Sequence, residues 1–581
     1  MILQALLERY EDLAARGEIS KPGWSPVNVS FGLVLSDNGE LEQVVPLLEE
    51  VMRGKKSVQA PRVMQVPEQI VRAGIKPKSN FLCDNSSFIL GIDGKGKPEQ
   101  AASYFEVCAA LHNEILADVD SPAAHTILRF FETWNPGSAE NHPALIECLE
   151  DIKSGANIIF RVRGQFAHED AMIAAAWQCQ YEIDEGDEKG VCLVTGKDSS
   201  TTARIHPKIK GVRGAQTMGA SLVAFDKGSP AYSSFGKLEG DNAPVGKYAA
   251  FAYGTALNAL LADREHIQQF GDTTLVFWAK SGQVACQNIF SQMLGTTSNE
   301  MTDSSLKSAM MRLASGKPTQ WEDTEISPDT PFYILGLAPN AARLSVRFFL
   351  RDSFGAFAAK LWAHQERLEI ARPAFDKRES LSVWELLRET VNPNSREKKA
   401  SPLMSGELIR AILSGGRYPA TLLNNVMLRI RAEREITRGR AAIIKAYYSR
   451  NEHIDCPREV LTVQLNDSKN TAYRLGRAFS LLESIQETAN PGIKATIRDK
   501  YFNSASATPA TVFPRLINLA QHHLRKIDGG LKVHLERELS EVLVDIADFP
   551  ARLSLPGQGA FQLGYYHQRQ KRFESKKRED N

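Results

Sequence analysis

The sequence lacks a long hydrophobic run. No apolar stretch among its 581 residues approaches the roughly 18 residues that a membrane-spanning helix needs. The first residues, MILQALLERYEDLAARGE, mix acidic and apolar side chains, so they lack the apolar core of a signal peptide. Their apolar positions recur at helical spacing, which predicts an amphipathic helix. We therefore expect no membrane partner.

Cysteine is sparse and unpaired. The seven cysteines are scattered, and none forms a C-x-x-C pair. This odd number and wide spacing argue against a disulfide framework and indicate a reducing, cytoplasmic compartment. Cys179, Cys192 and His206 lack the paired spacing of zinc ligands, so buried free thiols are the ordinary interpretation. We expect no metal and no cofactor.

The chain also lacks an excess of charge. Its net charge is +1, so any affinity for nucleic acid must come from local basic patches. Its hydrophobic content of 43% is that of an ordinary folded protein. The length predicts roughly three to five domains.

Catalytic motifs are missing. The phosphate-loop pattern is nearly met at residues 190–197, but Gly190 and Gly196 are one residue too far apart. Asp198 stands where a serine or threonine would hold magnesium. There is no H-E-x-x-H, no G-x-S-x-G and no acidic cluster with the spacing of a two-metal nuclease. These absences favour a binding protein over an enzyme, and we assign no catalytic residue.

Glycine, lysine and amide side chains gather in residues 191–261. The apolar runs Val191–Thr195 and Ala220–Phe225 predict two strands, and Pro244 predicts the start of a helix. Glycine permits close approach of the backbone to a partner, lysine and arginine bind phosphate, and amides read base edges. A solvated surface loop is the alternative interpretation.

Strand patterns recur up to about residue 350, and helical patterns follow. The sequence therefore predicts an α+β protein: a mixed N-terminal α/β domain (1–350), a helical connecting region (351–455) and a C-terminal helical bundle (456–581). In the N-terminal domain we expect strands at Val27–Leu35, Asn157–Gly164, Thr273–Ala279 and within Phe332–Phe349, a hairpin at Phe81–Gly91, and helices at Leu41–Met52, Ala101–Asp118 and Pro122–Trp134. Beyond it we expect helices at Ser380–Thr390, Pro402–Leu413, Ala420–Thr437 and Arg440–Tyr447, then bundle helices that begin near Asp467, Pro509, Leu531 and Gly559.

Several stretches resemble a known family. They are FLCDNSSFILG, VTGKDSSTTARIHPKIKGV, FGKLEGDNAPVGKYAAFAYGTALNALL, LAPNAARLSVRFF, and the terminal block from AYRLGRAFSLLESIQ to FPARLSLPGQGAFQLGYYHQRQ. Over nearly its whole length the chain resembles the large subunit of the type I-C CRISPR surveillance complex, Cascade.

The resemblance implies a subunit without chemistry of its own. Such a subunit would sit at the 5′ handle of the CRISPR RNA, with the handle-binding subunit, the backbone subunits and the small subunits as partners. It would check target double-stranded DNA for the protospacer-adjacent motif, help to part the strands and guide the displaced strand. It would then recruit a helicase–nuclease. The protein would read the short motif, and base pairing would read the rest.

The resemblance also implies that the C-terminal bundle equals the small subunit, made from a translation start inside the same gene. Met427 is the last methionine of the chain and lies before the bundle. We therefore expect either a non-methionine start near Val460–Val463 or a longer product from Met427.

Three groups of residues follow from these interpretations, with a purely structural role as the alternative for each one. For reading of the DNA motif we assign Lys208, Lys210, Gln216, Ser221, Asn242 and Asn85. For phosphate contact we assign Lys76, Lys78, Arg213, Lys237, Lys247, Arg429, Arg434 and Arg438. For the path of the displaced strand we assign Arg474, Arg477, Lys494, Arg498 and Arg525. Two other functions stay open: a nuclease hidden in the N-terminal part, and an assembly scaffold without DNA contact.

Overall fold

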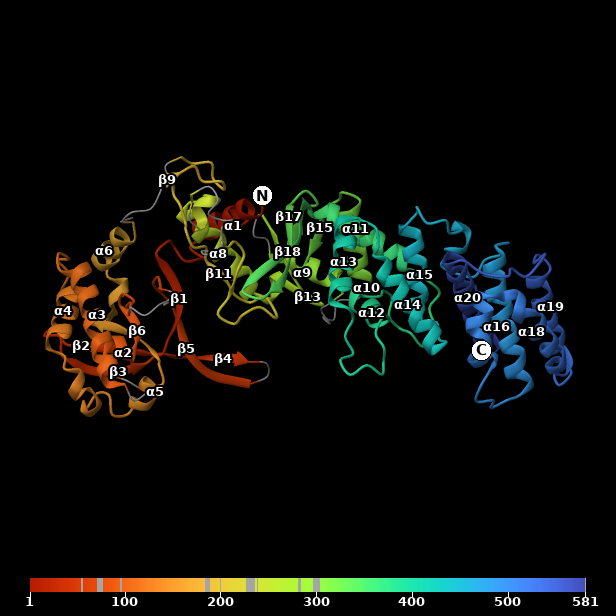
Figure 1. The fold of residues 1–581 in the computed structure, drawn as a ribbon, viewed down its shortest axis with the longest axis horizontal. Coiled ribbons are helices and arrows are strands. Elements are labelled where there is room, and N and C mark those ends of the chain that lie inside the picture. Colours follow the sequence, from red (N-terminus) through yellow and green to blue (C-terminus); the bar gives the residue numbers. More distant parts are fainter. Residues whose placement is uncertain are drawn as a thin grey trace. The chain divides into compact units, whose positions relative to one another are not determined.

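The computed structural model describes residues 1–581 apart from 54–55, 71–76, 93, 95–96, 183–188, 199, 226–235, 238, 281–283, 296–302 and 580–581. The chain divides into two compact units (Figure 1). Unit 1 comprises Met1, Leu3–Pro207 and Ala224–Ala256, and unit 2 comprises Ile2, Lys208–Val223 and Leu257–Asn581. Both units take part of the predicted N-terminal domain 1–350.

In the part that the structure describes, unit 1 contains two main sheets and a separate two-stranded sheet of β9 and β10. In the larger sheet the order is β3-β2-β7-β6, β8 pairs with β7, and β2 runs parallel to β7. The smaller sheet is antiparallel with the order β1-β5-β4. Helices α3, α4 and α6 bury their apolar side chains in one core with the larger sheet. The strands are β1 (Trp24–Val29), β2 (Phe31–Leu35), β3 (Leu41–Pro46), β4 (Leu48–Arg53), β5 (Lys56–Pro67), β6 (Cys83–Asn85), β7 (Asn157–Val162), β8 (Gln165–Phe166), β9 (Lys189–Gly190) and β10 (Ser200–Thr201). The helices are α1 (Ile2–Ala15), α2 (Ser86–Ile89), α3 (Pro98–Leu116), α4 (Pro122–Thr133), α5 (Leu149–Lys153), α6 (Ala171–Glu182) and α8 (Lys247–Ala262), whose last residues belong to unit 2.

Two predictions for unit 1 are wrong. The expected helix Leu41–Met52 forms β3 and β4, because each half pairs with a different strand and Pro46 ends the first half. Tertiary pairing here overrides a helical pattern. The expected hairpin Phe81–Gly91 has only the short strand β6, followed by α2. Asn85 caps that helix by accepting a hydrogen bond from the Ser87 N–H at 3.1 Å.

The first strand predicted in residues 191–261 is also wrong. Val191–Thr195 forms a turn, in which the Gly196 N–H donates to the Cys192 carbonyl at 2.8 Å. Val191 and Leu193 are 53% and 64% exposed, so this apolar run is not a buried strand. The second predicted strand is reduced to β12 (Ala220–Ser221).

Unit 2 begins with a six-stranded sheet of order β11-β12-β18-β17-β14-β13. The prediction for Thr273–Ala279 is confirmed: this segment forms β14, and every residue of it is buried. The predicted pair of strands in Phe332–Phe349 is confirmed as β17 and β18. The strands of the sheet are β11 (Lys208–Ile209), β12, β13 (Ile267–Phe270), β14, β17 (Pro331–Asn340) and β18 (Arg343–Ser353). A separate two-stranded sheet consists of β15 (Thr319–Trp321) and β16 (Thr324–Ile326).

Helices follow the sheet, as expected, and the α+β class is confirmed. A continuous core runs from the sheet through these helices to the C-terminal bundle. After β18 come α11 (Phe354–Leu368), α12 (Val383–Arg388), α13 (Pro402–Ser414), α14 (Ala420–Glu433) and α15 (Arg438–Arg450). Two further helices, α9 (Val284–Met293) and α10 (Asp303–Ala314), lie between β14 and β15 in the chain. The bundle is α16 (Thr471–Ala489), α17 (Ile497–Ala507), α18 (Pro509–Leu524), α19 (Gly529–Leu543) and α20 (Leu555–Glu579), of which α17 is absent from the predicted set.

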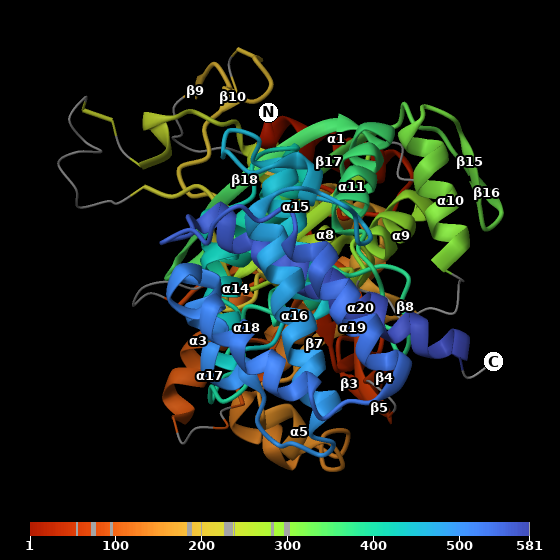
Figure 2. The same cartoon turned by 90° about the vertical axis from the view of Figure 1, so that its right-hand side faces the viewer.

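Two glycines explain the centre of the bundle. Helices α16 and α20 lie side by side (Figure 2). A Cβ atom on Gly476 would collide with the Phe561 carbonyl, and one on Gly564 would collide with the Tyr473 carbonyl. Glycine at these two positions therefore lets the helix backbones touch.

Candidate nucleic-acid interface

Four of the six predicted motif readers lie at one end of the six-stranded sheet, on β11, on β12 and in the loop between them. Lys208 and Ser221 face each other across these strands, and the Lys208 Nζ donates to the Ser221 Oγ at 2.8 Å. Lys208 is exposed, whereas Ser221 is buried. Ser221 thus orients Lys208 rather than offering its own hydroxyl to a partner.

Asn258 of α8 holds this edge in place. Its Oδ1 accepts a hydrogen bond from the Lys210 N–H at 2.8 Å, and its Nδ2 donates to the Lys208 carbonyl at 3.0 Å. The sequence analysis missed Asn258. The available signal was a single amide within the apolar run TALNALL.

The loop 210–219 turns its polar side chains outward. Lys210, Arg213 and Gln216 are exposed, and Met218 is 81% exposed. Two backbone hydrogen bonds close the loop, from Ala215 to Val212 and from Gly219 to Gln216. Gly219 has a φ of +98°, and a Cβ atom there would lie 2.9 Å from the Lys208 Cβ. Glycine is required for this return to the sheet.

A further cation joins the same edge from β18. Arg343 pairs with Ser221 in the parallel β12–β18 ladder and is exposed. We call Lys208, Lys210, Arg213, Gln216 and Arg343 the edge patch. Its side chains combine four positive charges with one amide, which suits contact with phosphates and with a base edge.

The two predicted readers in unit 1 serve local structure. Asn85 caps α2, as described above. The Asn242 amide donates to the carbonyls of Glu239 at 3.0 Å and Lys237 at 3.4 Å, which closes the short turn Glu239–Asn242. These contacts favour structural roles for both amides over the base reading predicted for them.

His206 is not a cationic phosphate ligand. Its Nδ1 lies 2.7 Å from the Tyr253 hydroxyl, and burial lowers its pKa to about 4. The imidazole is therefore neutral at physiological pH. Among the described residues, no three histidine, cysteine or acidic side chains gather closely enough to hold a metal ion.

The predicted phosphate contacts have mixed surroundings. Lys76 lies outside the described residues, whereas Lys78, Lys237 and Lys247 are exposed in unit 1. In unit 2, Arg429 pairs with Glu433 at 3.2 Å, and Arg434 ends α14 in the left-handed conformation.

Arg438 differs, because it is buried. Its guanidinium contacts the Asp376 carboxylate at 3.1 Å and the carbonyls of Arg378 and Glu379 at 2.7 and 3.0 Å. Arg378 and Arg438 hold the pKa of Asp376 far below its ordinary value. This placement favours a structural role for Arg438, which anchors the segment 376–379, over the predicted phosphate contact.

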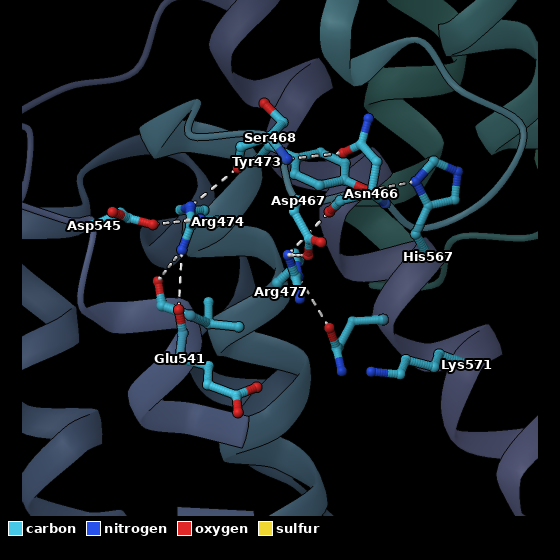
Figure 3. A network of polar contacts seen from close by, with 12 residues as sticks. Asn466, Asp467, Ser468, Tyr473, Arg474, Arg477, Glu541, Asp545, His567 and Lys571 are labelled. Atoms are coloured by element: carbon cyan, nitrogen blue, oxygen red, sulfur yellow. Dashed lines mark hydrogen bonds and ion pairs between the residues drawn. The ribbon is translucent and has the colours of Figure 1, made fainter. Parts of the chain in front are cut away.

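Arg474 and Arg477, predicted to contact the displaced strand, are also buried (Figure 3). Arg474 donates to the carbonyls of Ser468, Glu541 and Val542 at 3.0 to 3.1 Å and pairs with Asp545. Figure 3 shows Ser468, Glu541 and Asp545 around its guanidinium.

Arg477 has a similar environment. It donates to Gln568 Oε1 and to the Asn466 carbonyl, both at 3.0 Å, and lies 3.7 Å from Asp467. The two arginines therefore join the segment 466–468 to α19 and α20. Their burial favours a structural role over the predicted DNA contact.

The other three residues of that group lie nearer the surface. Lys494 and Arg525 are exposed. Arg498 is 26% exposed and lies 3.6 Å from Glu483. A path for the displaced strand along these side chains stays a prediction.

Two comparisons bear on the identity of the chain. The model of the family described as CRISPR-associated protein (Cas_Csd1) matches residues 6–573, which include both units and the bundle. A search of curated proteins gave no match.

Among the described residues, no helix is both long and apolar enough to cross a membrane.

Proposed function

We propose that this chain, which belongs to the CRISPR-associated Csd1 family of type I-C large subunits, recognises the protospacer-adjacent motif in double-stranded DNA. Family membership places the chain in a CRISPR complex with other Cas subunits. The observation that carries the finer proposal is the edge patch, where a closed glycine loop holds exposed cations beside an exposed amide.

The edge patch suggests how the work is divided among its side chains. Lys210, Arg213 and Arg343 would bind phosphates and set the register of the duplex, while Gln216 would meet a base edge. Because the minor groove offers a degenerate pattern, the close approach that the exposed Gly214 permits would contribute to selectivity. The guide RNA would read the rest of the target.

In this proposal the chain does no chemistry. It sits at the handle end of the CRISPR RNA beside the handle-binding, backbone and small subunits, stabilises the opened strands and recruits the helicase–nuclease that cuts. Support comes from the family and from the binding character of the edge patch.

The test uses the chain co-expressed with its partner subunits and a CRISPR RNA. Binding is measured to duplexes that match the guide and differ only in the flanking trinucleotide. We expect strong dependence on this flank, lost when the chain is omitted. Binding that needs the guide match but ignores the flank would contradict motif recognition and leave the chain a scaffold.

We also propose that the bundle is produced separately as the small subunit. In the full chain α20 packs on α15, where Gly559 of α20 lies against Tyr448 of α15. The Tyr566 hydroxyl of α20 also donates to the Ala371 carbonyl, which follows α11, at 2.6 Å. A product that starts near Val460 would expose this face of α20. Mass spectrometry of the purified complex tests the proposal, and a complex without any C-terminal polypeptide would refute it.

A further inference from the structure

A cavity of about 320 Å³ lies in unit 2 between α11, α13 and α15. Its floor is apolar and made of small side chains, including Ala356, Ala359 and Ala363 of α11. Three cationic side chains line it, Lys360, Arg367 and Arg450, and no carboxylate does so in the part of the chain that the structure describes. None of the edge-patch residues lines this cavity.

The cations converge on the turn that follows α13. A Cβ atom on Gly415 would lie 3.3 Å from the Arg450 Nη2 and 3.9 Å from the Lys360 Cε. The Arg450 Nε donates to the Gly416 carbonyl at 2.8 Å, which fixes the guanidinium at the cavity. Arg367 lies beside the Tyr418 hydroxyl.

The two guanidinium groups are poorly neutralised. Lys360 donates to Asp352 at 2.7 Å, but within the described residues neither Arg367 nor Arg450 forms an ion pair with a carboxylate. Burial and the charge of Arg367 lower the pKa of Arg450. The charge of Glu452 counteracts this lowering, but Glu452 itself pairs with Arg458 at 3.3 Å. Like charges gathered in a partly buried wall are unfavourable unless an anion compensates them.

The neighbouring histidine adds no charge. His364 is 2% exposed, and its Nδ1 lies 2.5 Å from the Tyr418 hydroxyl. Burial, assisted by Arg367, lowers its pKa to about 3, so the imidazole is neutral at physiological pH. It packs in the wall, so the positive charge at the cavity comes from Lys360, Arg367 and Arg450.

We propose that this cavity binds a nucleotide. The phosphate would lie between the forked donors of Arg367 and Arg450, with Lys360 at the rim. The base would lie on the alanine floor of α11. A bare phosphate would leave this apolar wall in water, whereas a nucleotide covers it. The site could take a free mononucleotide or one nucleotide of a single strand. The inference rests on the cavity and does not depend on motif recognition at the edge patch.

Calorimetric titration of the full chain tests the proposal with three probes: inorganic phosphate, AMP and a short single-stranded oligothymidine. The double variant Arg367→Gln with Arg450→Gln is compared with Arg417→Gln, a matched control on the same turn that is exposed and does not line the cavity. We expect the double variant to lose about tenfold or more in affinity for a nucleotide probe, because two charged hydrogen bonds are removed, and the control to keep wild-type affinity.

A second variant, Ala359→Leu, fills the floor and keeps every charge. It should weaken the nucleotide probes and spare any binding of phosphate. Binding of AMP identifies a free nucleotide as a ligand, whereas binding of the oligothymidine alone identifies a strand. Equal affinities of wild type and both cavity variants for all three probes would overturn the proposal. Lys210→Gln, which alters only the edge patch, should leave the titration with AMP unchanged, so failure of one proposal is distinguishable from failure of the other.

Discussion

The edge patch and the helices α14 to α16 are both basic in sequence, but they use their cations differently. In the edge patch Lys210, Arg213 and Arg343 are exposed, on or beside a glycine-rich loop. In the helices Arg438, Arg440, Arg474 and Arg477 are buried. The comparison teaches that a run of arginines in a helical region can be internal scaffold, whereas cations between glycines point to a surface.

The physical reason lies in the guanidinium group. Its five donors match several acceptors at once, so one buried arginine can satisfy the carbonyls at a helix end together with a carboxylate. Arg474 does this for three carbonyls and Asp545. Among the residues that the structure describes, the closed turn at 210–219 gives Lys210 and Arg213 no comparable set of acceptors, and both side chains are exposed.

The largest effect should come from removing a buried arginine. Arg474→Met leaves three carbonyls without a donor, so we expect the free energy of unfolding of the bundle to fall by about 3 kcal/mol. Chemical denaturation of the full chain, with hydrogen exchange of the α19 amides, measures it. Arg525→Met, an exposed arginine of the same bundle, should change stability by less than about 0.5 kcal/mol. If Arg474→Met and Arg525→Met both lower the free energy of unfolding by equally small amounts, the contrast between buried and exposed arginines would be contradicted.

Acid should weaken the scaffold region next. Burial, with Lys445 and Arg477, lowers the pKa of His567 to about 4 from an ordinary 6.5. The unfolded chain therefore binds this proton first, and the stability due to neutral His567 is complete above pH 6.5 and lost as pH falls toward 4. By pH 5 the loss should be about 2 kcal/mol. His567→Gln should flatten this pH dependence of bundle stability, and an unchanged slope would show that other groups cause it.

On the edge patch, an amide change should affect selectivity rather than stability. We expect Gln216→Ala to reduce the preference for the correct flanking motif about tenfold, while binding to unrelated duplex persists. Thr217→Ala, on the neighbouring exposed residue, serves as the control. Competition binding with duplexes of varied flank measures the ratio. If the preference for the correct flanking motif stays intact in Gln216→Ala, the residue that reads the motif lies outside this loop.

The smallest effect should come from the exposed cations of the bundle. Lys494→Gln and Arg525→Gln should each lower the dependence of single-strand binding on salt by about 0.7 in the log–log slope. Titrations of the assembled complex at several salt concentrations measure it. A slope that stays at the wild-type value would remove these residues from the path of the displaced strand.

Much of the fold could be predicted from the sequence where one periodic pattern is long and uninterrupted. The buried strand β14 and the helices α16, α18 and α19 are such cases. The helix predicted for Leu41–Met52 was wrong because the strands that pair with this segment, β2 and β5, lie elsewhere in the chain. The buried strand predicted for Val191–Thr195 was wrong because this segment forms a turn that exposes Val191 and Leu193.

The residues of the edge patch, like the fold, could be predicted from the sequence only in part. Exposure of Lys210, Arg213 and Gln216 follows from the glycines around them, which local sequence reveals. The contributions of Asn258 and Arg343 to the edge patch depend on pairing between segments far apart in the chain, so no local sequence pattern predicts them. The burial of arginines such as Arg474 likewise depends on α19, about 70 residues later in the sequence.

The most direct test of this account is the salt dependence of duplex binding by the assembled complex, compared between wild type and the variant carrying Lys210→Gln, Arg213→Gln and Arg343→Gln. If these side chains contact phosphates, the log–log slope should fall by about 0.9 for each cation removed, with the thermal stability of the chain unchanged. A slope equal to that of the wild type would contradict the claim that the edge patch binds DNA.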